Sequence, residues 1–351
     1  MRRVTAAAMV GAALLLAAGC SSSSSSSSSS TTSSTTGSAS AVAAAPVTVR
    51  LGFLENITHA SALVALKEGY FTSALGSAGT LKATAFSTGT EETTAILAGQ
   101  LDAAYVGPNP AINAWQKSSG TAIKIVSGAA TGGASVVVSK GITSAAQLKG
   151  KTLATPSLGN TQDVALRYWL KQNGIATTAT GGGDAFIKPT TPNSAAVLEF
   201  KSGQIAGGSE PAPYDIEMVK DGGTVLYTEP GVTTILVVTQ SFLTAHPAVV
   251  ADLIKAQIQA NSFIKSNPTA AEADANAELA SYTGKPLKSS LVAAAFKEIT
   301  FTNDPDESSL TTDASQAVSL GLLKPVNLNG IFDLGPLNAA LTAAGQPQIS
   351  S

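Results

Sequence analysis

Uncharged hydrogen-bonding side chains stand where predicted strands give way to predicted helices, and their types suit them to bind a ligand. Four such junctions carry a good helix-capping residue type: Thr58, Thr90, Asn109 and Asn160. The first N–H groups of a helix have no partner within the helix, and the helix dipole adds a partial positive charge there. Several helix starts gathered at one place would therefore bind an anion without any lysine or arginine.

One string has the spacing of a covalent catalyst. Ser262 and Lys265 form an SxxK pattern, in which a serine nucleophile lies one helical turn from a lysine. The string falls near the end of a predicted helix, and its usual KTG and SDN companions are missing from the sequence. HExxH, GxSxG and Walker-type phosphate loops are absent from the sequence as well. We therefore interpret the pair as two side chains on a helix surface and expect no enzymatic activity.

The composition excludes several other kinds of site. Cys20 is the only cysteine, and His59 and His246 are the only histidines, so we expect no disulfide, no thiolate or histidine-based metal site and no cofactor. Lysine and arginine number 21 against 23 acidic residues, and the formal net charge is −2. A nucleic-acid partner would call for a clustered positive surface, and the sequence has no basic run, so we expect no such partner.

Short apolar runs alternate with helical stretches after residue 45, which predicts an α/β fold with largely parallel sheets. The alternation occurs twice, with a first unit that begins at a strand over 47–53 and a second that begins at a strand over 135–139. In open parallel sheets, the carboxyl ends of the strands and the helix starts that follow them face one crevice. We expect the four junctions to line that crevice.

The first residues form a targeting segment. Arg2 and Arg3 precede an apolar stretch over 4–16 and small residues at 17–19, which is typical of an export signal. The apolar stretch is shorter than the roughly 20 residues that a transmembrane helix needs.

Cys20 follows the small residues at once, and the segment therefore resembles the lipobox of bacterial lipoproteins. The resemblance implies that residues 1–19 are a signal peptide that is removed, and that a lipid on Cys20 anchors the protein to the membrane outside the cytoplasm. An ordinary secretion signal with an incidental cysteine is the alternative. Residues 20–45 are rich in serine and threonine and should form a flexible tether.

Three further blocks of sequence stand out by their specific order of residues. They read LGF at 51–53, YVGPNPAIN at 105–113 and LGNTQDVALR at 158–167. Together they resemble the nitrate/sulfonate/taurine group of substrate-binding proteins of bacterial ABC importers. Shorter strings resemble the C-terminal half of that group: AHP at 245–247, TGKPL at 283–287 and GIFDL at 330–334.

The resemblance implies a periplasmic-binding-protein type II fold, in which two α/β lobes hold a ligand in the cleft between them. Lobe 1 would comprise residues 46–134 and 241–351, and lobe 2 residues 135–240, with 135–139 and 234–239 as crossing segments. The ligand-binding residues that the resemblance and the junctions imply are Asn56, Thr58, Gly89, Thr90, Pro108, Asn109, Thr131, Gly133, Asn160, Thr161, Gln162 and Glu210.

One stretch departs from the family pattern. The group often carries G-x-W-x-P-E-P-W in the second lobe, where this chain reads GGSEPAPY at 207–214. Ser209, Ala212 and Tyr214 stand in place of Trp, Glu and Trp, which should enlarge or reshape the pocket. Glu210 could supply a carboxylate to the pocket from the neighbouring position, or it could point to solvent.

The resemblance implies a monomeric receptor that closes its lobes on a small polar solute and delivers the solute to an ABC permease and its ATPase. A sulfonate, taurine or a similar oxyanion or zwitterion would fit, and an inward Glu210 would favour the zwitterion. A receptor for a vitamin precursor such as a pyrimidine, and a ligand sensor not coupled to transport, are the alternatives. Relatives of this fold also include pyrimidine-forming proteins of thiamine biosynthesis, which rely on histidine- and cysteine-rich motifs that this chain lacks after residue 45.

Overall fold

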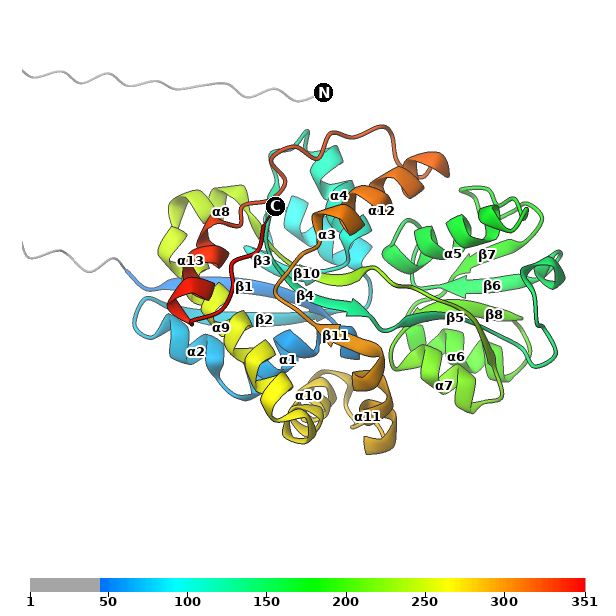
Figure 1. Ribbon diagram of the computed structural model, residues 1–351, viewed down its shortest axis with the longest axis horizontal. Coiled ribbons are helices and arrows are strands. Elements are labelled where there is room, and N and C mark those ends of the chain that lie inside the picture. Colours follow the sequence, from blue (N-terminus) through cyan, green and yellow to red (C-terminus); the bar gives the residue numbers. More distant parts are fainter. Residues whose placement is uncertain (1–44, 351) are drawn as a thin grey trace, which may run out of the picture. The chain divides into compact units, whose positions relative to one another are not determined.

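The computed structural model describes residues 45–350, which form two α/β lobes (Figure 1). Each lobe has its own sheet with helices on both faces, so the predicted two-lobed α/β fold is confirmed. The predicted signal peptide at 1–19, Cys20 and the tether up to residue 44 lie outside the described residues.

The first sheet has six strands in the order β11-β4-β10-β3-β1-β2. Its strands are β1 (Val47–Leu54), β2 (Gly79–Phe86), β3 (Ala103–Val106), β4 (Ile123–Gly132), β10 (Val232–Thr239) and β11 (Ile299–Phe301). β1 runs parallel to β2 and β3, whereas β10 runs antiparallel to β3 and β4. The carboxyl ends of β1, β2 and β3 therefore lie at one edge of this sheet.

The second sheet has five strands in the order β7-β6-β8-β5-β9. Its strands are β5 (Ala134–Val138), β6 (Thr152–Thr155), β7 (Phe186–Pro189), β8 (Gly207–Pro211) and β9 (Thr224–Thr228). β6 runs parallel to β7 and β8, whereas β5 runs antiparallel to β8 and β9. Both sheets are thus mixed, and the prediction of largely parallel sheets was wrong. Every antiparallel pair involves β4, β5 or β10. Each of these three strands adjoins a segment that connects the two lobes.

Helices cover both faces of the first sheet because alternate residues of its buried strands face opposite ways. Along β3, Tyr105 faces one hydrophobic cluster and Val106 the other. The first cluster is covered by α1 (Ala60–Lys67), α2 (Tyr70–Leu75), α8 (Gln240–Ala245), α9 (Pro247–Ser266), α10 (Pro268–Thr283), α11 (Ser289–Glu298) and α13 (Gly335–Ala343). The second is covered by α3 (Gly89–Leu97), α4 (Pro108–Lys117) and α12 (Glu307–Ser319).

The second sheet is covered in the same way by fewer helices. Leu166 and Leu170 of α5 (Thr161–Gln172) pack in a cluster on one face. The other face packs against α6 (Asn193–Lys201) and α7 (Tyr214–Lys220) through Phe200 and Met218. Along the chain, α5 follows β6 and α6 follows β7. The first residues of α5 and α6 therefore lie at the edge of the sheet where β6 and β7 end.

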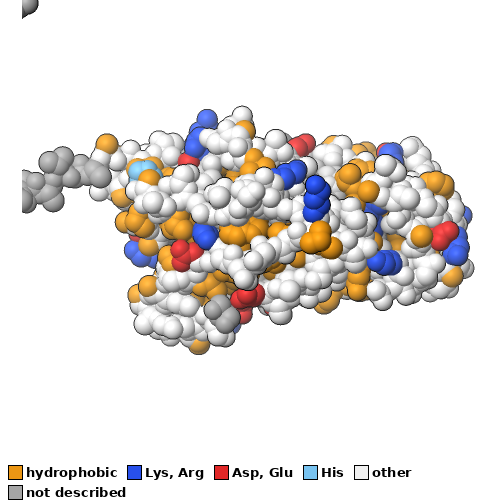
Figure 2. Space-filling view, turned by 90° about the horizontal axis from the view of Figure 1, so that it is seen from above, with side chains coloured by type: hydrophobic (Ala, Val, Ile, Leu, Met, Phe, Trp, Pro, Cys, Tyr) orange, Lys and Arg blue, Asp and Glu red, His pale blue; other side chains and the backbone are white. Residues whose placement is uncertain are grey.

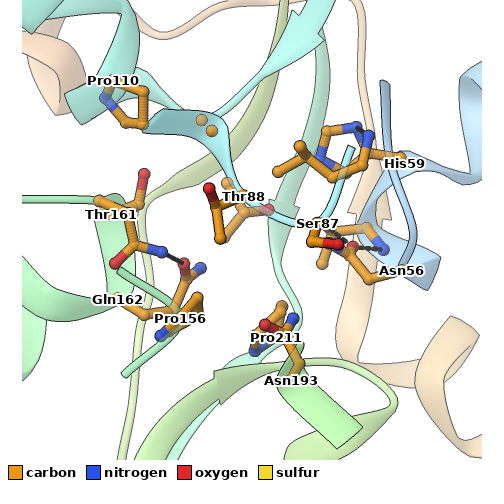
Figure 3. Close-up of a pocket in the computed structure, with 16 residues that line it drawn as sticks. Asn56, His59, Ser87, Thr88, Pro110, Pro156, Thr161, Gln162, Asn193 and Pro211 are labelled. Atoms are coloured by element: carbon orange, nitrogen blue, oxygen red, sulfur yellow. Dashed lines mark hydrogen bonds between the residues drawn. The ribbon is translucent and has the colours of Figure 1, made fainter. Parts of the chain in front are cut away.

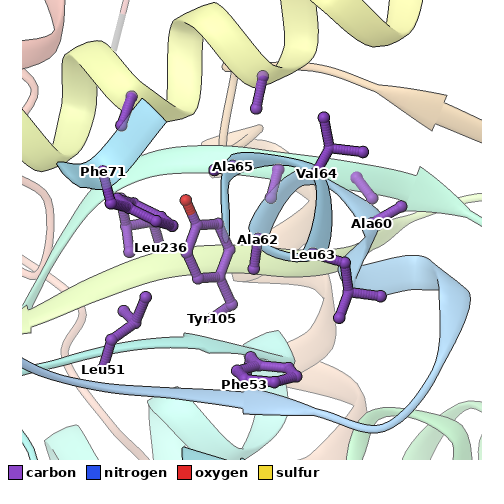
Figure 4. Close-up of a cluster of buried hydrophobic side chains, with 14 of the residues drawn as sticks. Leu51, Phe53, Ala60, Ala62, Leu63, Val64, Ala65, Phe71, Tyr105 and Leu236 are labelled. Carbon is purple, nitrogen blue, oxygen red and sulfur yellow. The ribbon is translucent and has the colours of Figure 1, made fainter. Parts of the chain in front are cut away.

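The core of the first lobe fixes the strands that end at the cleft (Figure 4). Leu51 and Phe53 of β1 are fully buried, and they pack in one cluster with Leu63 of α1 and Leu236 of β10. Tyr105 of β3 lies in the same cluster, and its hydroxyl donates to Gln257 Oε1 at 2.7 Å. The polar end of this buried ring is therefore satisfied, as buried tyrosines require.

The chain passes from the first lobe to the second between β4 and β5, and it returns between β9 and β10. Gly132 and Gly133 lie at the first crossing with φ values of 71° and 73°, a conformation that residues with a side chain rarely adopt. A Cβ on Gly133 would also collide with the Ile299 side chain. Glycine is therefore required at this crossing.

The return crossing lies earlier in the chain than the sequence predicts. Residues 234–239 belong to β10 inside the first sheet, so the second lobe ends near Pro230 and not at residue 240. Residues 235–238 are fully buried between β3 and β4, because an uninterrupted apolar run suits a strand covered on both faces. Residues 135–138 likewise lie within β5 of the second sheet, just after the first crossing.

Charged side chains lie singly or in small groups on the face drawn in Figure 2, and most of that face is uncharged. This distribution reflects the low content of charged residues, which make up 13% of the chain. Among the helices between residues 45 and 350, none combines the length and the apolar character needed to cross a membrane.

Candidate ligand-binding pocket between the lobes

A small pocket lies between the lobes, where strands from both sheets end (Figure 3). The first sheet contributes the carboxyl ends of β1, β2 and β3, and the second contributes those of β6 and β8. The pocket is lined by Leu54, Asn56, Thr58, His59, Ser87, Thr88, Gly89, Gly107, Pro110, Pro156, Asn160, Thr161, Gln162, Asn193, Pro211 and Thr233. Ligands of open α/β sheets bind at such an edge.

Four α-helices begin at the pocket, two from each lobe. In the first lobe, Gly89 is the first residue of α3 and Gly107 precedes the first residue of α4. In the second lobe, Thr161 is the first residue of α5 and Asn193 the first residue of α6. The positive ends of four helix dipoles and the N–H groups of their first turns therefore converge from both sides.

Asn160 caps α5, as the sequence predicts. Its Oδ1 accepts from the Asp163 backbone N–H at 2.9 Å, and its Nδ2 donates to Gln162 Oε1 at 2.9 Å. The second bond holds the Gln162 carbonyl, so the Gln162 amide N–H groups remain as donors beside the pocket.

Thr88, and not Thr90, caps α3. Thr88 has an extended backbone and its Oγ1 accepts from the Glu91 N–H at 3.2 Å, because the helix begins directly after the turn that follows β2. Thr90 is already the second residue of the helix and does not line the pocket. Its hydroxyl lies 3.0 Å from the Ser157 hydroxyl of the other lobe, at the exposed rim.

Pro108 and Asn109 belong to the first turn of α4 but do not line the pocket. Gly107 takes the capping position, since Pro108 with its fixed φ fits the first helical position. Asn109 is the next residue, and its Nδ2 donates to the Asp313 carbonyl of α12 at 3.3 Å, away from the pocket. Pro110 occupies the pocket wall in its place.

Asn56 and Thr58 both line the pocket and bond to each other. Asn56 Oδ1 accepts from the Thr58 backbone N–H at 3.0 Å and from the Thr58 hydroxyl at 2.6 Å. Thr234 of β10 donates to the Thr58 carbonyl at 3.1 Å and so ties this turn to the first sheet. The Asn56 amide N–H groups are left as donors.

His59 lines the pocket, although it is not among the ligand-binding residues expected from the sequence. Its Nδ1 accepts from the Leu54 N–H at 3.2 Å, and burial lowers the pKa of the ring to about 3. The ring is therefore neutral at physiological pH, and its proton lies on Nε2, where it can be donated. Its position directly after Thr58 was the available signal in the sequence.

The pocket carries no formal charge on the described residues that line it, because none of them is a lysine, arginine, aspartate or glutamate. Two of its polar atoms, Thr161 Oγ1 and Asn193 Oδ1, are buried and have no hydrogen-bond partner within residues 45–350. Buried polar groups normally have partners, so an unpartnered pair at a pocket indicates a place for a ligand or water.

Three other predicted residues do not line the pocket. Thr131 donates to the Thr300 carbonyl at 3.4 Å, and Gly133 packs on Ile299 at the crossing. Glu210 is fully buried in β8, and both of its carboxyl oxygens lack a hydrogen-bond partner in the described part of the chain. It points neither into the pocket nor to solvent, so both orientations considered for it were wrong.

The sequence missed several lining residues besides His59. They are Leu54, Ser87, Thr88, Pro110, Pro156, Asn193, Pro211 and Thr233. Thr88 and Asn193 could have been found as capping residue types after a predicted strand. Thr233 could not, because its place depends on β10 entering the first sheet.

The two lobes touch around the pocket. The Ile57 N–H donates to the Ala212 carbonyl at 3.0 Å, and the Tyr214 hydroxyl donates to the Glu55 carbonyl at 3.0 Å. The enclosed volume is only about 20 Å³, which is room for about one water molecule. Entry of a ligand therefore requires the lobes to separate first.

Two α/β lobes joined by two crossing segments, with a pocket of helix starts between them, define the class of the periplasmic binding proteins. The NMT1-like family model matches residues 42–281, which is more than half of the chain. The chain therefore belongs to the NMT1-like family.

Solved structures show the same fold at low sequence identity. The alkanesulfonate-binding protein SsuA from Xanthomonas axonopodis pv. citri, bound to MOPS, is 17% identical, with a TM-score of 0.70 over 84% of this chain and 100% of that one. The periplasmic nitrate-binding protein NrtA from Synechocystis PCC 6803 is 14% identical, with a TM-score of 0.73 over 86% and 90%. The C27S mutant of DSZB with biphenyl-2-sulfinic acid is 15% identical, with a TM-score of 0.61 over 84% and 99%.

No curated protein sequence matches the chain. The family match and the structural neighbours nevertheless confirm the predicted resemblance to the nitrate/sulfonate group of binding proteins. At these identities the neighbours establish the fold, and the ligand has to be argued from the pocket itself.

Proposed function

We propose that this protein is an extracytoplasmic receptor that captures a small oxyanion, such as nitrate or the sulfonate group of a small organic molecule. The observation that carries the proposal is the convergence of four helix N-termini, two from each lobe, on a pocket lined by uncharged residues. Helix N-termini bind anions through their free N–H groups and their dipoles. A ligand that contacts both lobes stabilises their closed arrangement.

The lining residues favour an oxyanion over the other ligands considered. Among the described residues, no carboxylate lines the pocket, so the amine of a zwitterion such as taurine has no counter-charge there. No phenylalanine, tyrosine or tryptophan lines it either, so a pyrimidine would lack an aromatic stacking partner. The side chains of Asn56, His59 and Gln162 instead present N–H donors.

Delivery of the ligand to an ABC permease and its ATPase follows from the resemblance to importer binding proteins. A lipid on Cys20 would keep the receptor beside its permease. Export is supported by the sequence of the first 20 residues and by the periplasmic location of the nitrate-binding neighbour.

Isothermal titration of the purified protein tests the ligand class. Nitrate, ethanesulfonate and taurine would be compared with ethanol as an uncharged control. We expect binding of nitrate or ethanesulfonate, and at least a tenfold loss of affinity in Gln162→Leu, which removes a donor. Gln116→Leu is the matched control, because Gln116 lies on the outer end of α4 and does not line the pocket. The absence of heat with every oxyanion would contradict the proposal.

A further inference from the structure

A second cavity adjoins the crossing segments on the other side of Thr161 and Thr233, which it shares with the pocket between the lobes. It lies between α5 of the second lobe, α12 of the first lobe and the return crossing from β9 to β10. Its volume is about 280 Å³, against about 20 Å³ for the pocket between the lobes. A molecule bound here would contact both lobes.

The walls of this cavity are acidic. Glu229, Asp306 and Asp313 line it, and no lysine, arginine or histidine appears among its lining residues in the part of the chain that the structure describes. The acidic cavity thus differs from the neighbouring pocket, which is uncharged, although Thr161 and Thr233 line both.

Two of the carboxylates are buried in or beside the cavity wall. Glu229 is only 4% exposed, and its Oε1 accepts from the Ser209 hydroxyl at 2.5 Å. Asp313 Oδ2 is buried and lacks a hydrogen-bond partner within residues 45–350. Carboxylates buried without a counter-charge are costly, so a bound cation would stabilise their charged forms.

Other groups in the cavity suit an ammonium ion. Thr161 is 6% exposed and forms part of the wall that this cavity shares with the pocket between the lobes. Tyr227 forms part of the wall, and its ring stacks on Trp169 with the centroids 5.9 Å apart. An aromatic face held in this way attracts a cation.

The size and the ligand set favour an organic cation over a metal ion. No group of three or more histidine, cysteine, aspartate or glutamate side chains between residues 45 and 350 is placed to hold a metal. A volume of about 280 Å³ is also larger than a bare ion needs and suits a short-chain amine.

We propose that this acidic cavity binds a small organic cation with a primary ammonium group, which lies between Glu229 and Asp313 and links α5 of one lobe to α12 of the other. The site is separate from the oxyanion pocket and would hold the lobes together from the side of the crossing segments.

The surrounding charges make this binding dependent on pH. Burial and the charges of Glu229 and Asp306 raise the pKa of Asp313 well above its ordinary value, and burial raises that of Glu229 to about 7. Glu210 and Asp215 lie on the second-lobe side of Glu229, and burial raises the pKa of both well above the ordinary values. Tyr227 lies near both Glu229 and Asp313. Protons therefore compete with the ammonium group, and the affinity should rise with pH through neutrality.

Titration of the purified protein with 1-propylamine near pH 8 tests the proposal. The controls are 1-propanol, which has the same chain without the charge, and sodium chloride at equal ionic strength. We expect saturable binding and a raised melting temperature with propylamine alone. An equal effect of sodium chloride would mean that any cation screens the carboxylates, and it would overturn the proposal, as would no effect of propylamine.

Variants locate the site. Asp313→Asn and Glu229→Gln should each lower the affinity for propylamine at least tenfold, whereas Glu307→Gln should not, because Glu307 is an exposed residue of α12 that does not line the cavity. Thr312→Lys places a tethered ammonium group from the cavity wall and should abolish propylamine binding in a folded protein. Unchanged propylamine binding in Asp313→Asn or Thr312→Lys would overturn the proposal. Nitrate titrations run in parallel keep this outcome separate from that of the oxyanion pocket.

Discussion

Gly107 of the first lobe lies directly against Thr161 of the second lobe, where the starts of α4 and α5 meet. A Cβ on Gly107 would stand 2.5 Å from the Thr161 hydroxyl oxygen, closer than real Cβ atoms come to other atoms. The φ of Gly107 is −71°, so its backbone could accept alanine. Glycine is therefore required at position 107 because a side chain would collide with the other lobe, and not because of the backbone conformation.

Gly107→Ala should hold the lobes apart. We expect the affinity for nitrate or ethanesulfonate to fall at least tenfold, while the melting temperature changes little, because each lobe keeps its own core. Isothermal titration and thermal unfolding measure the two effects. Gly182→Ala is the matched control, since a Cβ there meets only Thr178 Oγ1 at an ordinary 3.5 Å. Equal ligand affinity in Gly107→Ala and the native protein would show that this contact does not limit closure.

Two substitutions of Asn160 separate its capping role from the charge of the pocket. Asn160→Ala should lower the free energy of unfolding by about 1 kcal/mol, because the cap of α5 is lost. Asn160→Asp keeps the cap, so it should keep the stability, but it places a carboxylate in the pocket and should weaken oxyanion binding by more than tenfold. Urea unfolding and titration calorimetry provide the two readouts. Tight oxyanion binding by Asn160→Asp would contradict the proposed ligand class.

The stability of the fold should depend on pH through buried carboxyl groups. Burial raises the pKa of Glu92, Glu210, Asp215 and Asp313 well above the ordinary values, and that of Glu229 to about 7. The folded protein thus holds protons that the unfolded chain releases above about pH 4.5. The free energy of unfolding should therefore fall as pH rises from about 4.5 to about 7.

His59 has the opposite effect. Its pKa is lowered to about 3, so its contribution to stability is present above the ordinary value of 6.5 and is lost as pH falls towards about 3. The effect of the five carboxyl groups is opposite in sign to that of His59. Because they are more numerous, we expect the free energy of unfolding to decrease as pH rises. Urea unfolding at several pH values measures the slope, and Glu229→Gln should flatten it while Glu307→Gln leaves it unchanged. A slope that Glu229→Gln does not alter would contradict the burial assigned to that carboxyl.

Cys20→Ser tests the anchor that the leader sequence predicts. We expect the native protein in the membrane fraction and the variant in the soluble fraction after export. The melting temperature of the domain after residue 45 should be the same in both. Cell fractionation followed by immunoblotting measures the distribution, with Ser21→Ala as the control. Native protein found wholly in the soluble fraction would favour the ordinary secretion signal.

Much of the site could be predicted because helix starts leave local signals. Asn160 stands three residues before Asp163, and Asn56 stands two residues before Thr58, and each pair is joined by the bond that its spacing allows. The predicted cap at Thr90 lies two residues too late, since Thr88 and Thr90 are both good capping types and only the end of β2 decides between them. Short-range chemistry therefore identified the loops but not always the residue.

The sequence by itself determined the α/β class, the twofold alternation of strands and helices and the loops that meet at the cleft. These properties follow from periodicity, capping types and proline positions, which act over a few residues. Only the tertiary structure decided that Glu210 is buried away from the pocket, that Asn109 turns to α12 and that Gly107 meets Thr161. Each of these outcomes depends on a neighbour that is distant in sequence, because the direction of a side chain is set by the element packed against it. The acidic cavity between α5 and α12 arises in the same way, from three segments that the fold alone brings together.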